Sequence, residues 1–268
     1  MKRPDDNILR VENVVKSFHG VTAVSDVSFD VKRGSIKAII GPNGAGKTTL
    51  LNVISGIMRP DAGRIYFNNN NITALPPPVI ALKGIGRTFQ LIKLFSVNNA
   101  SVLDNVLLGA NRKLNPGILK SLLLRSRMNK QERSVQDTAL KILKFVGLGN
   151  MAHFSPLALS FGSQRMVELA RSLIGEPALL LLDEPASGLN DVEVENFRET
   201  LLAIQQAWGI TILLIEHNMK LVMTVAEDIV VVDFGQKIAE GTPAEIGKNP
   251  QVIRAYLGED YMKREVVG

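Results

Sequence analysis

The sequence predicts an α/β fold: a parallel-sheet core with an N-terminal antiparallel β layer and an inserted helical subdomain. Three observations support this prediction. Region 9–67 alternates in the manner of strands, a glycine-rich loop lies between an apolar strand and a helix, and apolar strands alternate with helices after residue 164. At 268 residues with 46% hydrophobic composition, the chain has ample material for a buried core.

Region 9–67 is expected to form an antiparallel layer around the glycine-rich loop. Its strand-like stretches are separated by turn signals at 32–34 (Lys-Arg-Gly) and 61–63 (Asp-Ala-Gly). Within it, residues 36–40 are typical of a short buried strand and 47–57 of the helix that follows.

The character of the chain changes after Gln90. Residues 102–108 and 131–146 have helical periodicity, and an Asn-Pro-Gly stretch at 115–117 interrupts the chain between them. Further on, the apolar strands 178–182, 211–215 and 229–232 alternate with helices, as in a parallel sheet covered by helices. We therefore assign about 92–162 to a helical insertion, about 1–91 and 163–250 to the core, and 251–268 to a C-terminal tail.

The composition indicates an intracellular setting. The chain has no cysteine, which excludes disulfides and thiolate metal sites, and no apolar stretch of a signal peptide follows Met1-Lys2-Arg3. Its apolar runs are far shorter than the roughly 20 residues of a membrane-spanning helix, so another chain would have to cross any membrane involved. A net charge of +5 is too small to decide between nucleic acid, anionic lipid and neither.

The loop before residue 47 fits the pattern G-x-x-x-x-G-K-[ST], which would occur by chance on the order of once in a hundred chains of this length. Glycines let the backbone wrap around phosphate oxygens, and the helix N-terminus adds a favourable dipole. Lys47 is expected to reach the β- and γ-phosphates, and Thr48 to offer its hydroxyl to Mg²⁺. An ordinary glycine-rich turn is the alternative. The expected phosphate-binding residues are Gly41, Pro42, Asn43, Gly44, Ala45, Gly46, Lys47, Thr48 and Thr49.

Two carboxylates, Asp183 and Glu184, follow the apolar run 179–182. The carboxyl end of a buried strand is where α/β sheets place their ligands. We expect Asp183 to hold Mg²⁺ through water and Glu184 to polarise the water that attacks the γ-phosphate. An acidic turn without function is the alternative, but it suits an isolated pair better than one that follows a phosphate-binding loop.

These motifs, in this order, resemble those of the ATP-binding subunits of ABC transporters, and the resemblance covers residues 9–256. It implies the ABC ATPase fold, in which a P-loop NTPase core binds ATP and Mg²⁺. The family's signature motif corresponds to residues 159–165 (Leu-Ser-Phe-Gly-Ser-Gln-Arg), which would open a helix running toward residue 174.

The resemblance implies that this signature binds the γ-phosphate of an ATP held by another subunit, in a head-to-tail dimer with two ATP molecules at its interface. The sequence departs from the commonest form at positions 161 and 163, where glycine and glutamine are usual. The signature residues expected at the partner's ATP are Ser160, Phe161, Gly162, Ser163 and Gln164.

Three further roles follow from the resemblance. His217 would contact the γ-phosphate and, with Glu184, position water. Gln90 would sense Mg²⁺ and water and couple the core to the insertion, and Phe18 would stack on adenine. A surface glutamine and a core phenylalanine are the alternatives for Gln90 and Phe18. The expected catalytic residues are thus Glu184, His217 and Gln90, the expected Mg²⁺ residues are Thr48, Gln90 and Asp183, and the remaining histidines, His19 and His153, are expected to be structural.

The loop after the carboxylates resembles the family's subunit-bridging loop, with asparagine at its last position where aspartate is more widespread. Communication between the two ATP sites is its implied role. Its residues are Ser187, Gly188, Leu189 and Asn190.

Within the family, the sequence is most similar to the first of two ATP-binding subunits of branched-chain amino acid importers. The segments 86–90, 186–190, 215–223 and 252–258 carry this resemblance. It implies two membrane-spanning permease subunits, a second ATP-binding subunit that is identical or different, an extracytoplasmic substrate-binding protein and no nucleic acid. The chain would lie peripherally on the cytoplasmic face of the bacterial inner membrane.

Other cargoes stay open, because the ATP site does not touch the cargo. Related subunits serve the uptake of urea or of other hydrophobic or aromatic acids, or lipopolysaccharide export. A soluble ABC ATPase that remodels nucleic acid or ribosomes is a more distant alternative, since such proteins usually carry two ATP units or long coiled-coil insertions, and the sequence has neither signal.

A basic segment lies between Arg112 and Arg133, where seven basic residues accompany the single acidic Glu132. We hypothesise that it lies near the membrane partner or anionic headgroups. A solvated basic face is the alternative. The basic residues are Arg112, Lys113, Lys120, Arg125, Arg127, Lys130 and Arg133.

Overall fold

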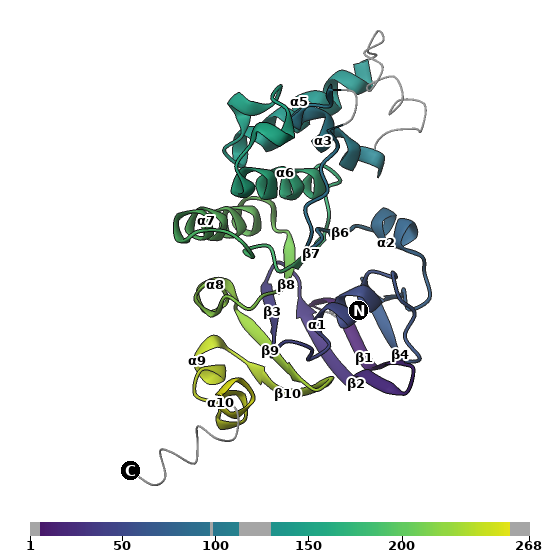
Figure 1. The fold of residues 1–268 in the computed structure, drawn as a ribbon. Helices are drawn as coiled ribbons and strands as arrows, with labels where there is room; N and C mark the ends of the chain where they lie inside the picture. Colours follow the sequence, from purple (N-terminus) through teal and green to yellow (C-terminus); the bar gives the residue numbers. More distant parts are fainter. Residues whose placement is uncertain (1–5, 97–98, 113–129, 258–268) are drawn as a thin grey trace.

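The fold was analysed in a computed structural model, which describes residues 6–96, 99–112 and 130–257 (Figure 1). Its larger sheet has the strand order β10-β9-β3-β8-β7-β6. The parallel strands pair as predicted, and β10 adds an antiparallel edge next to β9. The strands are β3 (Ile36–Ile40), β6 (Ile85–Arg87), β7 (Leu179–Asp183), β8 (Thr211–Ile215), β9 (Asp228–Asp233) and β10 (Gln236–Gly241).

The N-terminal region forms the predicted antiparallel layer, with the order β2-β1-β4-β5. Its strands are β1 (Asn7–Phe18), β2 (Val21–Lys32), β4 (Ala62–Phe67) and β5 (Asn70–Asn71). The tight turn between β1 and β2 consists of His19 and Gly20, both with positive φ (46° and 88°), as two-residue hairpin turns favour. His19 therefore lies in a hairpin turn, and its expected structural role stays a prediction.

The parallel strands join two cores because their side chains alternate between faces. In β7, Leu179 and Leu181 pack toward the antiparallel layer. Leu180 and Leu182 pack toward the helices. All five β7 residues are buried, so the strand carries its polar end into the interior of the molecule.

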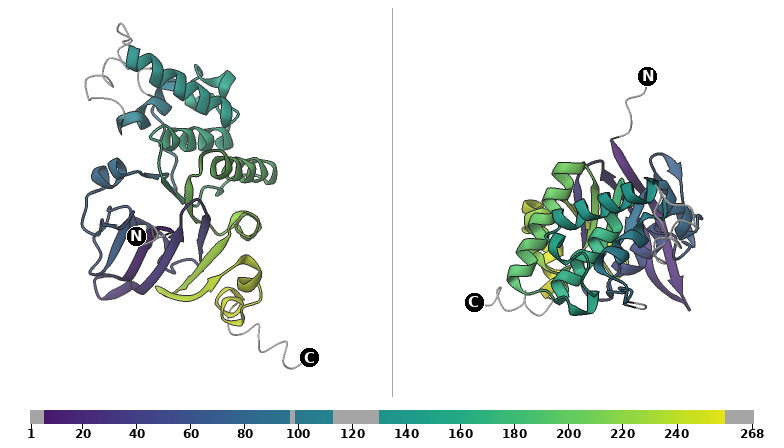
Figure 2. Two further views of the ribbon diagram at one scale, coloured as in Figure 1. Left: turned by 180° about the vertical axis from the view of Figure 1, so that it is seen from behind. Right: turned by 90° about the horizontal axis from the view of Figure 1, so that it is seen from above.

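The helical layer gathers at one end of the molecule, above the sheets in Figure 1. There α3, α5 and α6 pack on one another, and the view from above in Figure 2 shows them side by side. The helices are α1 (Lys47–Ile54), α2 (Pro77–Lys83), α3 (Val102–Leu107), η2 (Leu108–Arg112), α5 (Lys130–Phe145), η3 (Gly149–Met151), η4 (Pro156–Ala158), α6 (Phe161–Leu173), α7 (Asp191–Trp208), α8 (Met219–Val225), α9 (Pro243–Ile246) and α10 (Pro250–Leu257). In the described ranges, none is long and apolar enough to cross a membrane.

Helix α1 is three residues shorter than the predicted 47–57. It ends before Gly56, whose φ is +74°. A Cβ at Gly56 would lie 2.4 Å from the carbonyl oxygen of Leu75, so the chain after α1 packs closely against the loop that precedes α2, and the helix ends there. Most of the basic segment 112–133 lies outside the described residues, and its hypothesised role stays a prediction. The division into core, insertion and tail also stays a prediction.

Candidate functional site

The glycine-rich loop packs too tightly for side chains at two positions. Gly41 and Gly46 have φ values of 156° and 97°. A Cβ at Gly41 would lie 2.0 Å from the carbonyl oxygen of Val232, and one at Gly46 would lie 2.1 Å from that of Ala23. The loop backbone is thus wedged between β9 and β2 and leads directly into α1, with Gly46 as its N-cap. Unpaired N–H groups at such a helix start suit an anion.

Beside the loop lies a cavity of about 200 Å³. Its lining joins the expected phosphate-binding residues to a carboxylate, and consists of Ala23, Asn43, Gly44, Ala45, Gly46, Lys47, Thr48, Thr49 and Glu184. The Lys47 ammonium donates hydrogen bonds to the carbonyl oxygens of Gly41 (2.7 Å) and Pro42 (2.9 Å). Burial lowers the pKa of Lys47, while the carboxylates Glu184 and Asp183 oppose that shift.

The three residues expected to be catalytic meet at one carboxylate oxygen. Gln90 Nε2 donates to Glu184 Oε2 at 2.8 Å, and His217 Nδ1 lies 3.9 Å from the same oxygen. Glu184 and His217 come together because β7 pairs with β8 in parallel, with Asp183 opposite Ile215, and Gln90 follows β6, which pairs in parallel with the other side of β7. Glu184 itself has a positive φ of 46°, which is uncommon for a residue other than glycine.

Asp183 has one satisfied and one unsatisfied carboxylate oxygen. Oδ2 accepts a hydrogen bond from Arg87 Nη2 at 3.1 Å. Oδ1 is buried and has no hydrogen-bond partner. Burial raises the pKa of Asp183, and the neighbouring Arg87 opposes the shift. A buried, unpaired carboxylate oxygen fits a cation or its bound water.

The residues present therefore fit a Mg²⁺ that is held largely by phosphates and water. Thr48 is exposed at the start of α1 and lines the cavity. Within the described part of the chain, no group of three or more His, Cys, Asp and Glu could hold a metal, so protein ligands alone do not make a complete site there. This matches the usual way in which Mg²⁺ binds, through one or two protein ligands and substrate phosphates.

Phe18 lies at the end of β1 and is 39% exposed, so it is not a core residue. The Lys16 ammonium lies 5.5 Å from the centroid of its ring. Among the described residues, those that line the 200 Å³ cavity do not include Phe18. The adenine contact of Phe18 stays a prediction.

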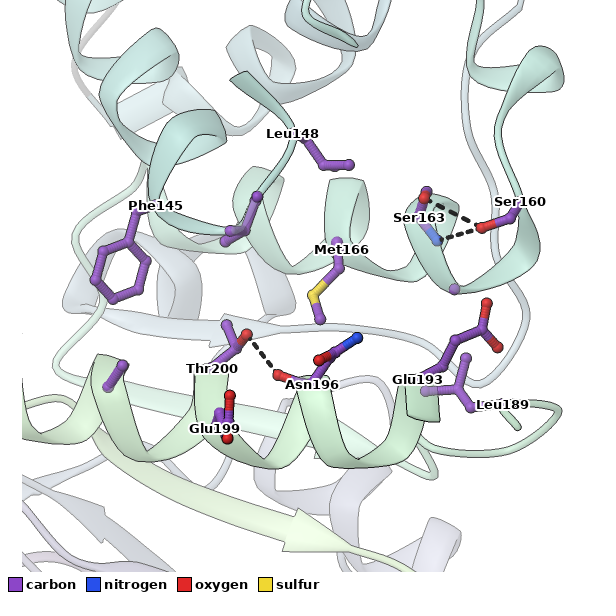
Figure 3. A pocket seen from close by; sticks show the side chains of 14 residues that line it. Phe145, Leu148, Ser160, Ser163, Met166, Leu189, Glu193, Asn196, Glu199 and Thr200 are labelled. Atoms are coloured by element: carbon purple, nitrogen blue, oxygen red, sulfur yellow. Dashed lines mark hydrogen bonds between the residues drawn. The ribbon is translucent and has the colours of Figure 1, made fainter. Parts of the chain in front are cut away.

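The signature residues lie apart from the phosphate loop of their own chain. Ser160 caps α6, accepting a hydrogen bond from the Ser163 N–H at 3.2 Å, and its hydroxyl also meets the Ser163 hydroxyl at 3.1 Å. Both residues line a separate cavity of about 590 Å³ between α6 and α7 (Figure 3). Gln164 Nε2 donates to the carbonyl oxygen of Leu159 at 3.1 Å.

The signature packs directly on the loop 187–190 of the same chain. A Cβ at Gly188 would lie 2.9 Å from the ring of Phe161, and one at Gly162 would lie 2.4 Å from the Glu193 carboxylate. Asn190 caps α7, accepting from the Glu193 N–H at 3.0 Å, while its own N–H donates to Glu193 Oε2 at 3.1 Å. The two motifs thus form one continuous surface.

Three residues at the site were not singled out from the sequence. Arg87 holds Asp183, and Glu216 is a fully buried carboxylate that directly precedes His217. The third, Tyr256 in α10, accepts a hydrogen bond from the backbone N–H of Gly41, and burial raises the pKa of Tyr256 to about 12. The sequence did show that Glu216 is an acidic residue directly after an apolar strand. It could not show that the carboxylate is buried and bonded to a distant segment.

A phosphate loop at the end of β3, paired carboxylates at the end of β7 and a glutamine that meets the second carboxylate define a P-loop ATPase. The chain belongs to the ABC transporter family, whose model matches residues 24–187. A second model, described as a branched-chain amino acid ATP-binding cassette transporter, matches residues 236–261. That segment contains α10 and Tyr256.

Two curated relatives match nearly the whole chain. The high-affinity branched-chain amino acid transport ATP-binding protein BraF of Pseudomonas aeruginosa is 40% identical over 97% of this chain and 100% of its own length. The corresponding protein LivG of Escherichia coli K12 is 38% identical over 94% of this chain and 98% of its own.

Solved structures share the fold. A nucleotide-free ATP-binding cassette from an ABC transporter superposes with a TM-score of 0.81 at 36% identity, covering 94% of this chain and 100% of that one. A cassette in its ADP conformation gives 0.82 at 36% identity, covering 94% and 99%. A dimeric bacterial ABC transporter cassette gives 0.74 at 27% identity, covering 88% and 98%. The predicted fold class is confirmed.

Proposed function

We propose that this chain is the ATP-hydrolysing subunit of an ABC importer for branched-chain amino acids. The observation that carries the ATPase assignment is the hydrogen bond of Gln90 to Glu184 beside the phosphate loop, at 2.8 Å. The cargo assignment is supported by the relatives BraF and LivG, which are named as branched-chain amino acid transport proteins, and by the match to the C-terminal family model.

The residues of the phosphate loop would bind the triphosphate of ATP. Lys47, which donates to carbonyl oxygens of its own loop, would exchange them for β- and γ-phosphate oxygens and gain a full charge interaction. Gly44 and Gly46 would offer backbone N–H groups, the Ala45 N–H would exchange its bond to the Pro42 carbonyl oxygen (3.2 Å) for a phosphate oxygen, and Phe18 would stack on adenine.

Thr48, Asp183 and Gln90 are the residues that we propose to hold Mg²⁺. When bound, this ion would neutralise charge on the β- and γ-phosphates. The buried, unpaired Oδ1 of Asp183 supports that assignment, and Arg87 would keep the carboxylate oriented through its other oxygen.

Glu184 would act as the general base. It would accept a proton from a water whose oxygen attacks the γ-phosphorus while the bond from that phosphorus to the bridging oxygen of ADP breaks, releasing phosphate. Gln90 and His217 would orient the water and the carboxylate, since both lie against Glu184 Oε2.

Each ATP site would be completed by a second subunit. Of the signature residues, Ser160, Gly162 and Ser163 line a cavity other than the one beside the phosphate loop of their own chain, and a related cassette has been solved as a dimer. We propose a head-to-tail arrangement in which Ser160 and the α6 N-terminus face the partner's ATP, and in which Ser187, Gly188, Leu189 and Asn190 bridge the subunits.

The proposed complex also includes two permease subunits and an extracytoplasmic substrate-binding protein, with this chain peripheral on the cytoplasmic face of the membrane. ATP binding would draw the subunits together and hydrolysis would release them. The names of the curated relatives as transport ATP-binding proteins support this arrangement.

Uptake of labelled leucine tests the cargo assignment. Cells would carry either the native chain or Glu184→Gln, with the rest of the system intact. We expect ATP-dependent uptake with the native chain and its loss in the variant, because the base that drives each cycle is gone. Equal uptake in both would reject the cargo assignment and direct the search to urea, aromatic acids or lipid export.

A further inference from the structure

Glu216 follows β8 directly and is fully buried. Three backbone N–H groups surround its carboxylate. Oε1 accepts from Ala186 at 2.7 Å, and Oε2 accepts from His217 at 2.9 Å and from Asn218 at 3.0 Å. Burying a carboxylate is costly unless its oxygens are hydrogen-bonded. The three backbone donors offset this cost, and each of them belongs to a turn at the site.

The first donor fixes the turn that presents Glu184. Ala186 lies two residues after Glu184, and the same turn is closed by the Ser187 N–H, which donates to the Glu184 carbonyl oxygen at 3.1 Å. Glu184 has a φ of 46°. A residue other than glycine keeps such a strained conformation only where its surroundings hold it.

The other two donors fix the turn that presents His217. The His217 side chain is 54% exposed, so its place depends mostly on the backbone beneath it. Asn218 is held on both sides, because its N–H donates to Glu216 and its side chain caps α8 by accepting from the Leu221 N–H at 3.1 Å. One carboxylate thus ties together the backbones that carry Glu184 and His217.

We propose that Glu216 is a positioning residue for ATP hydrolysis. Its carboxylate holds the Glu184 turn and the His217 turn at a fixed separation, so that both side chains reach the γ-phosphate and the attacking water together. The inference rests on the proposed function, which makes Glu184 the base. Glu216 does not appear among the described residues that line the 200 Å³ cavity, so ATP binding should not depend on it.

The substitution Glu216→Gln tests this role with little change in volume. A glutamine amide has a single acceptor oxygen, so either the Ala186 N–H or the His217 and Asn218 pair would face an NH₂ group. In the full-length chain within its assembled transporter, we expect kcat for ATP to fall about tenfold or more while KM changes by less than about twofold. Glu195→Gln, the same change at an exposed glutamate of α7 that lines neither cavity, is the matched control and should leave both constants unchanged.

A second variant and a mutant cycle separate positioning from folding. Glu216→Asp keeps the charge but is one methylene too short to reach both turns, so it should show the same split between kcat and KM. In a His217→Ala background, Glu216→Gln should lower kcat by a smaller factor than in the native chain, because the two residues act through one arrangement. A purely structural role would give equal factors in both backgrounds.

Measuring Glu216→Gln and Glu184→Gln together separates a failure of this inference from a failure of the proposed function. Unchanged kcat in Glu216→Gln would overturn the inference, and so would unfolding or loss of ATP binding in both Glu216 variants, since either result would assign Glu216 a structural role only. Glu184→Gln is measured in parallel. If that variant loses turnover while Glu216→Gln retains it, only the inference fails; if Glu184→Gln retains turnover, the proposed base is wrong.

Discussion

Among single residues, the glycines of the phosphate loop matter most, because they adopt backbone conformations and close contacts that residues with a Cβ cannot. Gly46 is both the N-cap of α1 and in the left-handed region, with φ 97°. The Ala23 carbonyl oxygen occupies the space where a Cβ would lie. The loop can approach the β2 backbone this closely because Gly46 has no side chain beyond hydrogen.

Gly46→Ala should therefore disrupt the phosphate site. A Cβ 2.1 Å from a backbone oxygen forces the loop to move, and the left-handed conformation alone costs about 1–2 kcal/mol. We expect loss of ATP affinity measured by calorimetry, together with a lower Tm.

Gly209→Ala is the matched control for that substitution. Gly209 also has a positive φ, 63°, but nothing lies within 4 Å of its would-be Cβ. We expect a loss of about 1 kcal/mol of stability and an unchanged ATP affinity. Equal ATP affinities in the two variants would show that the close approach at Gly46 is not required.

At the scale of elements, three neighbouring strands are joined by a charged group at one edge of the large sheet. Lys37 in β3 is only 3% exposed, and its ammonium donates to Asp228 in β9 at 2.6 Å and to Glu240 in β10. Glu240 also accepts from Lys237 at 2.7 Å. Partial burial opposes ionisation of Glu240, but the hydrogen bonds from Lys237 and Lys37 outweigh it and lower the pKa of Glu240.

The stabilisation from Glu240 should depend on pH. Because its pKa is lower in the folded chain than in the unfolded chain, the contribution is complete above the unfolded value and is lost as the pH falls through the folded value. We expect Glu240→Gln to be less stable than the native chain by about 1 kcal/mol at pH 7, with the difference vanishing once the pH is low enough to protonate Glu240 in the folded chain as well. Denaturant unfolding at both pH values measures it, and a difference that persists at low pH would contradict the explanation.

The elements differ in how well the sequence predicted them. Strands β3, β7, β8 and β9 were predicted because short apolar runs between turn signals are local patterns. The edge strand β10 was missed because Gln-Lys-Ile-Ala-Glu-Gly has no such run. Its formation follows from the turn at Phe234 and Gly235, whose φ values are both positive (43° and 78°) and so suit a tight hairpin.

At the site, the sequence predicted most of the functional residues but not the hydrogen bonds that connect them to distant segments. The phosphate loop and the carboxylates have local signatures, and the resemblance to ABC subunits added Gln90 and His217. The contacts of Arg87 with Asp183, of Glu216 with Ala186 and of Tyr256 with Gly41 join segments far apart in the chain. No pattern along one segment specifies which distant backbone will meet a buried side chain, so these required the structure.

In the whole molecule, the phosphate-loop site and the signature lie on different surfaces. The phosphate loop, Glu184, Gln90 and His217 meet where the parallel strands end, whereas the signature at the start of α6 lies with α7 and the loop 187–190 on another surface. Figure 1 shows α6 and α1 in different layers of the molecule. Under the proposed function, a single chain would present one incomplete ATP site and one surface that completes the site of another subunit.

Under the proposed function, Glu184 is the base of an ATP site shared between two subunits. ATP turnover and ATP-dependent dimerisation of the full-length Glu184→Gln chain, measured beside the native chain and Lys47→Ala, test this role. We expect Glu184→Gln to bind ATP, accumulate as a dimer and not turn over, and Lys47→Ala to fail to bind ATP. Turnover at the native rate in Glu184→Gln would show that Glu184 is not the base.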